Sequence, residues 1–296
     1  MDYLKYLEEP ELRKPTWVGA FIGWLDAQEG ASRSIRYLVK QLKAKRFVEI
    51  DPEEFYDFTA VRPSAYNDDQ GQRVIRWPTN ELFYWFNPET ETDFIFFLGT
   101  EPSLKWRTYI ETMMSVIDRY GVETVVTLGS LADAVPHTRD SLISGNANKD
   151  EIKDRLGGLR LMGSGYQGPV GITSVFADAC TKRGLDCLSL WGHAPHYVQR
   201  RPNDKVVKAL IGRLNQMLGL TVPLEEVEER ARTFETEVTK AISSSVEVSA
   251  YVKRLERQFD SAIEQGGELP NPEAVVDDLE AFLRQERSEG DQFSAN

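Results

Sequence analysis

Three histidines carry most of the chemistry that this sequence could perform, and two of them lie in one short stretch. His193 and His196 occur within LDCLSLWGHAPHYVQRRP, residues 185–202, and Tyr197 follows directly. The third, His137, lies in LADAVPHTRD and, like His196, directly follows a proline. Residues of these types could bind a metal ion, act as general bases or shape the chain at the end of a strand.

Metal binding and covalent catalysis are both poorly indicated. A zinc site needs three or four converging ligands, whereas His193 and His196 are separated by Pro195 and make a poor helical pair. Ser130 after TLG is a candidate nucleophile, but no G-x-S-x-G motif surrounds it. We therefore expect no metal and no cofactor, and no catalytic residue can be assigned firmly. The remaining hypothesis is structural: each Pro-His pair turns the chain off the sheet, and its imidazole bridges backbone groups there.

A glycine-rich segment, RLGGLRLMGSGYQGPVG at residues 155–171, could suggest a phosphate loop. It lacks G-x-x-x-x-G-K-[ST]. Gly168-Pro169 instead indicates the start of a helix, whose free N–H groups could hold an anion.

Strands and helices alternate along most of the chain. We predict strands at residues 16–24, 46–50, 93–99, 122–129 and 185–191, and helices at 30–45, 103–121, 171–184 and 203–219. This alternation predicts an α/β fold with a doubly wound, mainly parallel sheet and helices on both of its faces. Between the second and third strands, NDDQG predicts a hairpin of antiparallel edge strands. A loop rich in Gly and Asn is expected before the helix at 171–184.

The predicted strand ends gather polar residues. Ligands of open α/β sheets bind at the carboxyl ends of the strands. We therefore expect a candidate cleft formed by the polar residues that follow the strands: Asp26, Glu101, Ser130, His137, Arg139, His193, His196 and Tyr197. There Arg139 could clamp an anion, and a histidine could act as a general base.

Charge divides the chain. Residues 221–296 carry 18 acidic and 8 basic residues, a net charge of −10, out of −12 for the whole chain. We expect an α/β body at 1–220, an acidic helical subdomain at 221–286 and a disordered tail at 287–296. The subdomain is either a solvated cap on the body or an arm that binds a partner.

Composition also excludes several classes of protein. The negative charge argues against nucleic-acid binding, which needs clustered Lys and Arg. No apolar run approaches 18 residues, so no membrane span is expected. The two cysteines, Cys180 and Cys187, suit a reducing compartment. Together with an N-terminus that lacks the pattern of a signal peptide, these features predict a cytoplasmic protein.

Several long motifs resemble one known family. They include FLGTEPSLKWRTY, VVTLGSLADAVPHTR and YQGPVGITSVFADACTKRGLDCLSLWGHAPHYV, within residues 15–260. These motifs are similar to the bacterial branch of the proteasome assembly chaperone family, of the second-chaperone type. The resemblance implies a nucleoside-phosphorylase-like α/β fold, a C-terminal helical extension and self-association, for which a trimer is our working hypothesis. It also implies a proteasome-related or other protein partner.

Archaeal relatives can dock through a terminal hydrophobic-Tyr-any motif. This sequence ends in Ser294-Ala295-Asn296, so we do not expect that docking mode.

Two functions stay open. The first is a non-enzymatic, self-associating scaffold or chaperone, favoured by the resemblance and by the incomplete catalytic signatures. Its aromatic segment, Trp77 with residues 83–86, is either core or interface. The alternative is a protein that binds a nucleoside, nucleotide or other anionic ligand, or a phosphorylase- or hydrolase-like enzyme, using the strand-end cleft.

Overall fold

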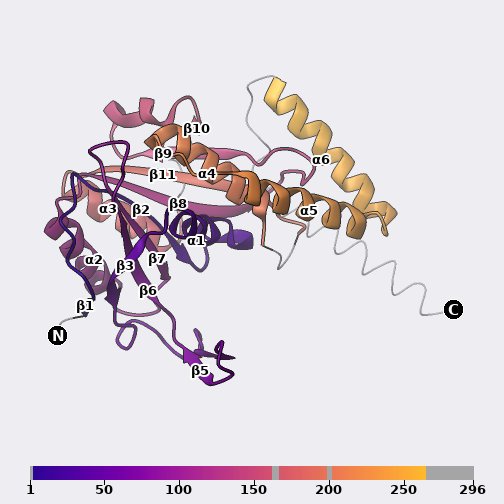
Figure 1. Cartoon of the computed structure of the whole chain (residues 1–296). Coiled ribbons are helices and arrows are strands. Elements are labelled where there is room, and N and C mark those ends of the chain that lie inside the picture. Colours follow the sequence, from indigo (N-terminus) through magenta and orange to yellow (C-terminus); the bar gives the residue numbers. More distant parts are fainter. Residues whose placement is uncertain (1–2, 162–166, 199–201, 265–296) are drawn as a thin grey trace.

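A nine-stranded sheet forms the centre of the molecule, and helices cover both of its faces (Figure 1). The computed structural model describes residues 3–161, 167–198 and 202–264. The four central strands run parallel to one another in the spatial order β7 (Phe94–Thr100), β2 (Thr16–Ile22), β8 (Thr124–Asp133) and β11 (Asp186–Pro195). Beside β7, the strands β6 (Asn80–Trp85), β3 (Lys45–Ile50) and β1 (Leu4–Tyr6) follow in this order, and each pairs antiparallel with the one before it. Beside β11, β9 (Ile143–Ala147) pairs antiparallel with β11, and β10 (Arg160–Leu161) pairs parallel with β9. The predicted doubly wound α/β fold is confirmed.

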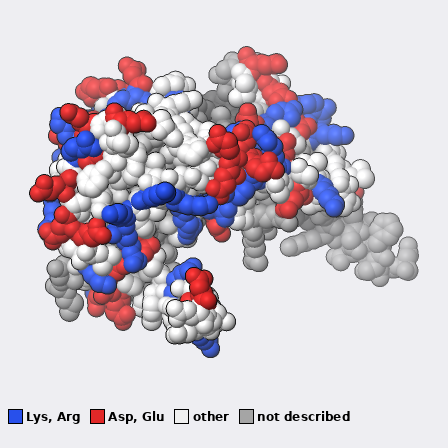
Figure 2. Space-filling model, viewed as in Figure 1, with Lys and Arg blue, Asp and Glu red and all other residues white. Residues whose placement is uncertain are grey.

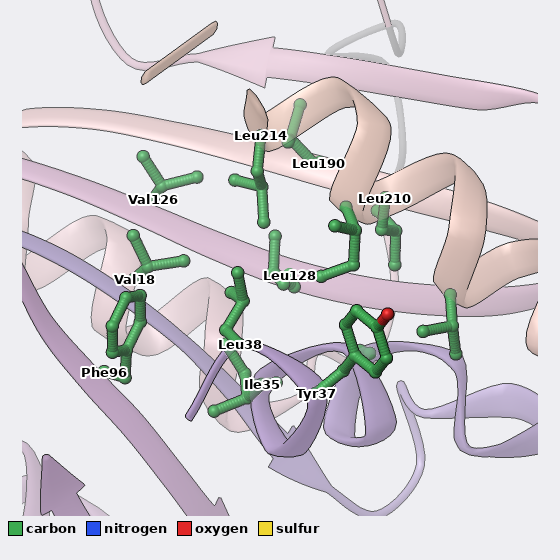
Figure 3. Packing of buried hydrophobic residues seen from close by; sticks show 14 of the residues in the cluster. Val18, Ile35, Tyr37, Leu38, Phe96, Val126, Leu128, Leu190, Leu210 and Leu214 are labelled. Carbon is green, nitrogen blue, oxygen red and sulfur yellow. The ribbon is translucent and has the colours of Figure 1, made fainter. Parts of the chain in front are cut away.

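Two pairs of helices sandwich the sheet. On one face lie α1 (Gly30–Leu42) and α4 (Asp204–Leu218), and on the other lie α2 (Trp106–Tyr120) and α3 (Ile172–Lys182). Figure 3 shows the first face, where Ile35 and Leu38 of α1 and Leu214 of α4 pack against Val18 and Val126 of the sheet. The apolar residues of α1 and α4 recur at helical spacing, which puts them on one side of each helix, facing the sheet.

The central strands are apolar on both sides because both faces are covered. In β2, Val18 and Ala20 join the α1–α4 side of the core, whereas Trp17 joins the α2–α3 side. A glycine makes room for a second tryptophan: a Cβ atom on Gly129 of β8 would lie 2.3 Å from the Trp191 ring on β11. Only a glycine lets the indole lie this close to the neighbouring strand.

The predicted hairpin is a separate two-stranded sheet. Its strands are β4 (Ser64–Asn67) and β5 (Arg73–Arg76), which pair antiparallel and project away from the body (Figure 1). Ile75 is 49% exposed, and Trp77 just beyond β5 is 47% exposed. An isolated two-stranded hairpin is only marginally stable in water, and apolar side chains that stay exposed add little to its stability.

Two long helices form the C-terminal extension: α5 (Glu225–Ile242) and α6 (Val246–Glu264). The extension packs on the body, since Val227 belongs to the same core cluster as α1 and α4. Acidic side chains gather at the start of α5 beside a row of Lys and Arg that crosses the body (Figure 2), and Lys40 bonds Glu226 at 2.9 Å. The predicted third helix and the tail at 287–296 lie outside the described residues.

Two differences from the sequence predictions affect the site. β8 and β11 extend four residues beyond the predicted strand ends, so His193 lies inside a strand. The expected Gly- and Asn-rich loop contains β9, which pairs antiparallel with β11. ISGNA has little intrinsic strand preference, so pairing with β11 decides its conformation.

Candidate functional site

The aligned ends of β8 and β11 place Asp133 beside two histidines. Asp133 pairs in register with Pro195. Its carboxylate lies 2.6 Å from Nδ1 of His193, and its backbone carbonyl lies 2.9 Å from Nδ1 of His196. Because both oxygens can only accept, each ring donates from Nδ1 and, when neutral, accepts at Nε2.

His193 also reaches a serine that sequence reasoning missed. Its Nε2 lies 2.8 Å from the Ser144 hydroxyl on β9, which completes an Asp133–His193–Ser144 array. The order of groups is that of a serine-hydrolase triad. However, Ser144 is 1% exposed and lies in the strand between β11 and β10. The array is therefore closed to substrate in this conformation.

The other two histidines bond the helical extension. His196 Nε2 lies 3.0 Å from the Tyr251 hydroxyl of α6. His137 Nε2 lies 3.0 Å from Thr239 Oγ1 of α5, and its Nδ1 lies 2.7 Å from the Tyr197 hydroxyl. The prediction that these imidazoles bridge backbone groups is wrong for three of their four hydrogen bonds, which join side chains. The exception is the bond from Nδ1 of His196 to the Asp133 carbonyl.

Burial, followed by the positive charge of Lys205, lowers the pKa of His137 below its ordinary value. The neutral ring fits its position, because Tyr197 accepts a hydrogen bond from the His137 backbone N–H and can donate its own proton to Nδ1. Nε2 then carries the proton and donates it to Thr239.

Arg139 is held by α6. Its guanidinium donates two hydrogen bonds of 2.8 Å to the Asp260 carboxylate, from Nε and from Nη2. This bidentate bond raises the pKa of Arg139 and lowers the pKa of Asp260. Asp260 thus occupies the fork that could have clamped an anionic substrate.

Asp26 and Ser130 form a second group at the start of α1. Oδ1 of Asp26 accepts from the backbone N–H groups of Ala31 and Ser32, at 2.9 and 3.1 Å. The Ser130 hydroxyl donates to the Ala27 carbonyl at 2.7 Å. Burial raises the pKa of Asp26, and its Oδ2 is buried without a hydrogen-bond partner among the described residues. This group caps α1 and links β8 to the turn that precedes that helix.

Glu101 belongs to a third place, the start of α3. Its carboxylate accepts from the Ile172 backbone N–H at 2.8 Å and from the Trp24 N–H at 3.4 Å. The helix start that could have held an external anion therefore holds a carboxylate of the chain itself.

The eight candidate residues thus form three groups at the strand ends. One group contains the three histidines, Tyr197 and Arg139, and α5 and α6 cover it. Beside His137 and His193 lies a cavity of about 10 Å³, about the size of one water molecule.

Asp133 and Ser144 were missed because they lie in strand segments that the sequence did not predict. Among the described residues, no cluster of three His, Cys, Asp or Glu side chains could hold a metal ion. No helix in the described part of the chain has the length and apolar character needed to cross a membrane.

A parallel-centred α/β body whose strand ends are covered by a helical extension defines the structural class. The chain belongs to the PAC2 family, whose model matches residues 20–242. A search of the curated proteins found no match.

Solved structures agree with this assignment. A PAC2 family protein from Streptomyces avermitilis is 36% identical, with a TM-score of 0.73 over 80% of this chain and 99% of that chain. A proteasome-assembly chaperone homologue from Mycobacterium tuberculosis is 35% identical, with a TM-score of 0.71 over 80% of this chain and 99% of that chain. An archaeal proteasome activator from Pyrococcus furiosus shares the fold at 19% identity, with a TM-score of 0.67 over 80% and 97% of the two chains.

Proposed function

We propose that this protein is a non-enzymatic scaffold or assembly chaperone that self-associates and binds a proteasome-related protein partner in the cytoplasm. The family supports a chaperone-like role, because one relative is described as a proteasome-assembly chaperone homologue. The observation that carries the proposal is the use of the strand-end residues. His137, His196 and Arg139 bond α5 and α6, so they anchor helices where an enzyme would bind substrate.

The β4–β5 hairpin is the proposed surface for self-association. Ile75 of β5 and Trp77 just beyond it are both about half exposed, so two large apolar side chains lie on the surface at this end of the hairpin. Exposed apolar patches of this kind mark interaction sites. A second copy that covers this face would also stabilise a hairpin that has little support from its own chain.

Sedimentation velocity of the purified protein tests this proposal. We expect an oligomer, with a trimer as the working size, and we expect Ile75→Asp to shift it toward the monomer. Gln70→Glu, which adds charge at the exposed hairpin turn, is the matched control and leaves the oligomer intact. A wild-type protein that stays monomeric at concentrations of tens of micromolar would refute the self-association proposal.

A second function, a hydrolase-like or small-molecule site, is favoured by the Asp133–His193–Ser144 array. Opening of the covering helices would be needed to admit a substrate. Two measurements test it: labelling of Ser144 by a fluorophosphonate, with Ser144→Ala as the control, and a thermal-shift screen of nucleosides, nucleotides and phosphate. An absence of both labelling and stabilisation would remove its support.

A further inference from the structure

A groove lies between the extension and the body. It has a volume of about 760 Å³, and residues of α4, α5, α6 and the segment 139–143 line it. In Figure 1, α5 and α6 meet at one end and diverge toward α4. Residues of all three helices line the groove. The extension is therefore an incomplete helical layer over α4.

The lining suits a packed helix. Gly212 and Ala209 of α4 and Ala231 of α5 are small, which allows the close approach of another helix. A Cβ atom on Gly212 would meet only Leu224, at 3.9 Å. Ile263 of α6 also lines the groove and is 57% exposed, so its apolar side chain is left uncovered.

Basic side chains also line the groove: Arg139, Lys205, Lys208, Arg213 and Arg232. All of these except Arg213 form ion pairs with carboxylates of the chain: Glu228, Glu229, Glu235, Glu256 and Asp260. Nε of Arg213 is buried without a hydrogen-bond partner among the described residues. An occupant with an apolar face and an acidic flank would cover the apolar walls and complement Arg213.

We propose that residues 271–286 of this same chain occupy the groove as an amphipathic helix. The segment NPEAVVDDLEAFLRQE opens with a helix-start signal, Asn271-Pro272. Its apolar residues recur at helical spacing, at Val275, Leu279 and Phe282. It carries five acidic residues and one arginine, so an acidic side chain is available to complement Arg213.

The position of the segment along the chain makes this docking possible. α6 ends at Glu264, directly after the groove residue Ile263. The six residues 265–270 can span up to about 20 Å, and a helix of 16 residues is about 24 Å long. A linker this short gives an effective concentration of the order of millimolar, so even a weak contact would be occupied.

Hydrogen exchange of the full-length protein, read by mass spectrometry, tests the proposal. We expect amides of residues 271–286 to exchange at least about tenfold more slowly than in a free peptide of the same sequence. Gly212→Leu fills the floor of the groove and should abolish this protection. Gly212→Ala adds only one methyl group where there is room, and should retain it.

A second variant keeps the body unchanged. Leu279→Asp combined with Phe282→Asp should also remove the protection, because it destroys the apolar face of the segment.

Three results would overturn the proposal. The first is exchange of the wild-type segment at the rate of the free peptide. The second is protection that survives Gly212→Leu, which would place the segment elsewhere. The third is protection that disappears on dilution, which would assign the groove to the segment of a second copy.

Discussion

The Tyr197 hydroxyl holds His137 in place through two hydrogen bonds, so its loss should lower the stability of the protein. It accepts a hydrogen bond from the His137 backbone N–H at 2.7 Å and bonds Nδ1 of the same residue at 2.7 Å. His137 is 3% exposed, so its polar groups depend on buried partners such as this hydroxyl. Burial raises the pKa of Tyr197, which keeps the hydroxyl protonated at neutral pH.

Tyr197→Phe removes the hydroxyl and leaves the ring in place. A buried polar group without a partner costs about 1–3 kcal/mol, and two such groups are left on His137. We expect a loss of about 2 kcal/mol in the free energy of unfolding, which is about a 30-fold change in the unfolding equilibrium constant. The assay is urea denaturation followed by circular dichroism.

Tyr66→Phe is the matched control. Tyr66 is 41% exposed on the hairpin, where surface substitutions change stability by less than about 0.5 kcal/mol. If Tyr197→Phe were as mild as this control, the hydrogen bonds at His137 would not anchor the strand ends.

Three further perturbations have defined outcomes. The pKa of His137 is lowered from 6.5, so below about pH 6.5 the unfolded chain binds a proton that the folded chain does not. The free energy of unfolding should therefore fall as the pH drops below about 6.5. Urea midpoints at pH 7 and pH 5.5 should differ less in His137→Gln than in the wild type. Asp26→Asn keeps the oxygen that caps α1 and removes a buried charge, so thermal melting should show a loss below about 0.5 kcal/mol, against about 1 kcal/mol for Asp26→Ala; equal losses would argue against capping. Gly129→Ala puts a methyl group into the Trp191 ring and should cost about 1–3 kcal/mol, part of which Trp191→Leu should restore in the double variant.

The layered body follows from local pattern. Apolar runs such as residues 93–99 can be satisfied only by a strand covered on both faces, and each helix shows one apolar stripe. The C-terminal ends of α2 and α4 were marked by Gly121 and Gly219, which adopt the left-handed conformation. Information of this kind is contained within about twenty consecutive residues.

The site depends on contacts between segments that are distant in the sequence, and local sequence patterns did not predict these contacts. Asp133 and Ser144 meet His193 only because β8, β11 and β9 are neighbours, and β9 has weak local strand preference. The candidate polar residues lie at or near the ends of the strands. Nothing in their local sequence reveals that His137 and His196 bond Thr239 and Tyr251, which lie more than fifty residues away in the sequence.

The most direct test of the anchoring role is native-state hydrogen exchange across α6. In the double variant Arg139→Ala/His196→Ala, the hydrogen bonds of these two residues to Asp260 and Tyr251 of α6 are lost. If these residues anchor the helix, amides of residues 252–259 will exchange at least about tenfold faster than in the wild type, while amides of β2 and β8 stay unchanged. Unchanged protection of α6 in the double variant would contradict the anchoring role and return these side chains to the list of candidates for catalysis.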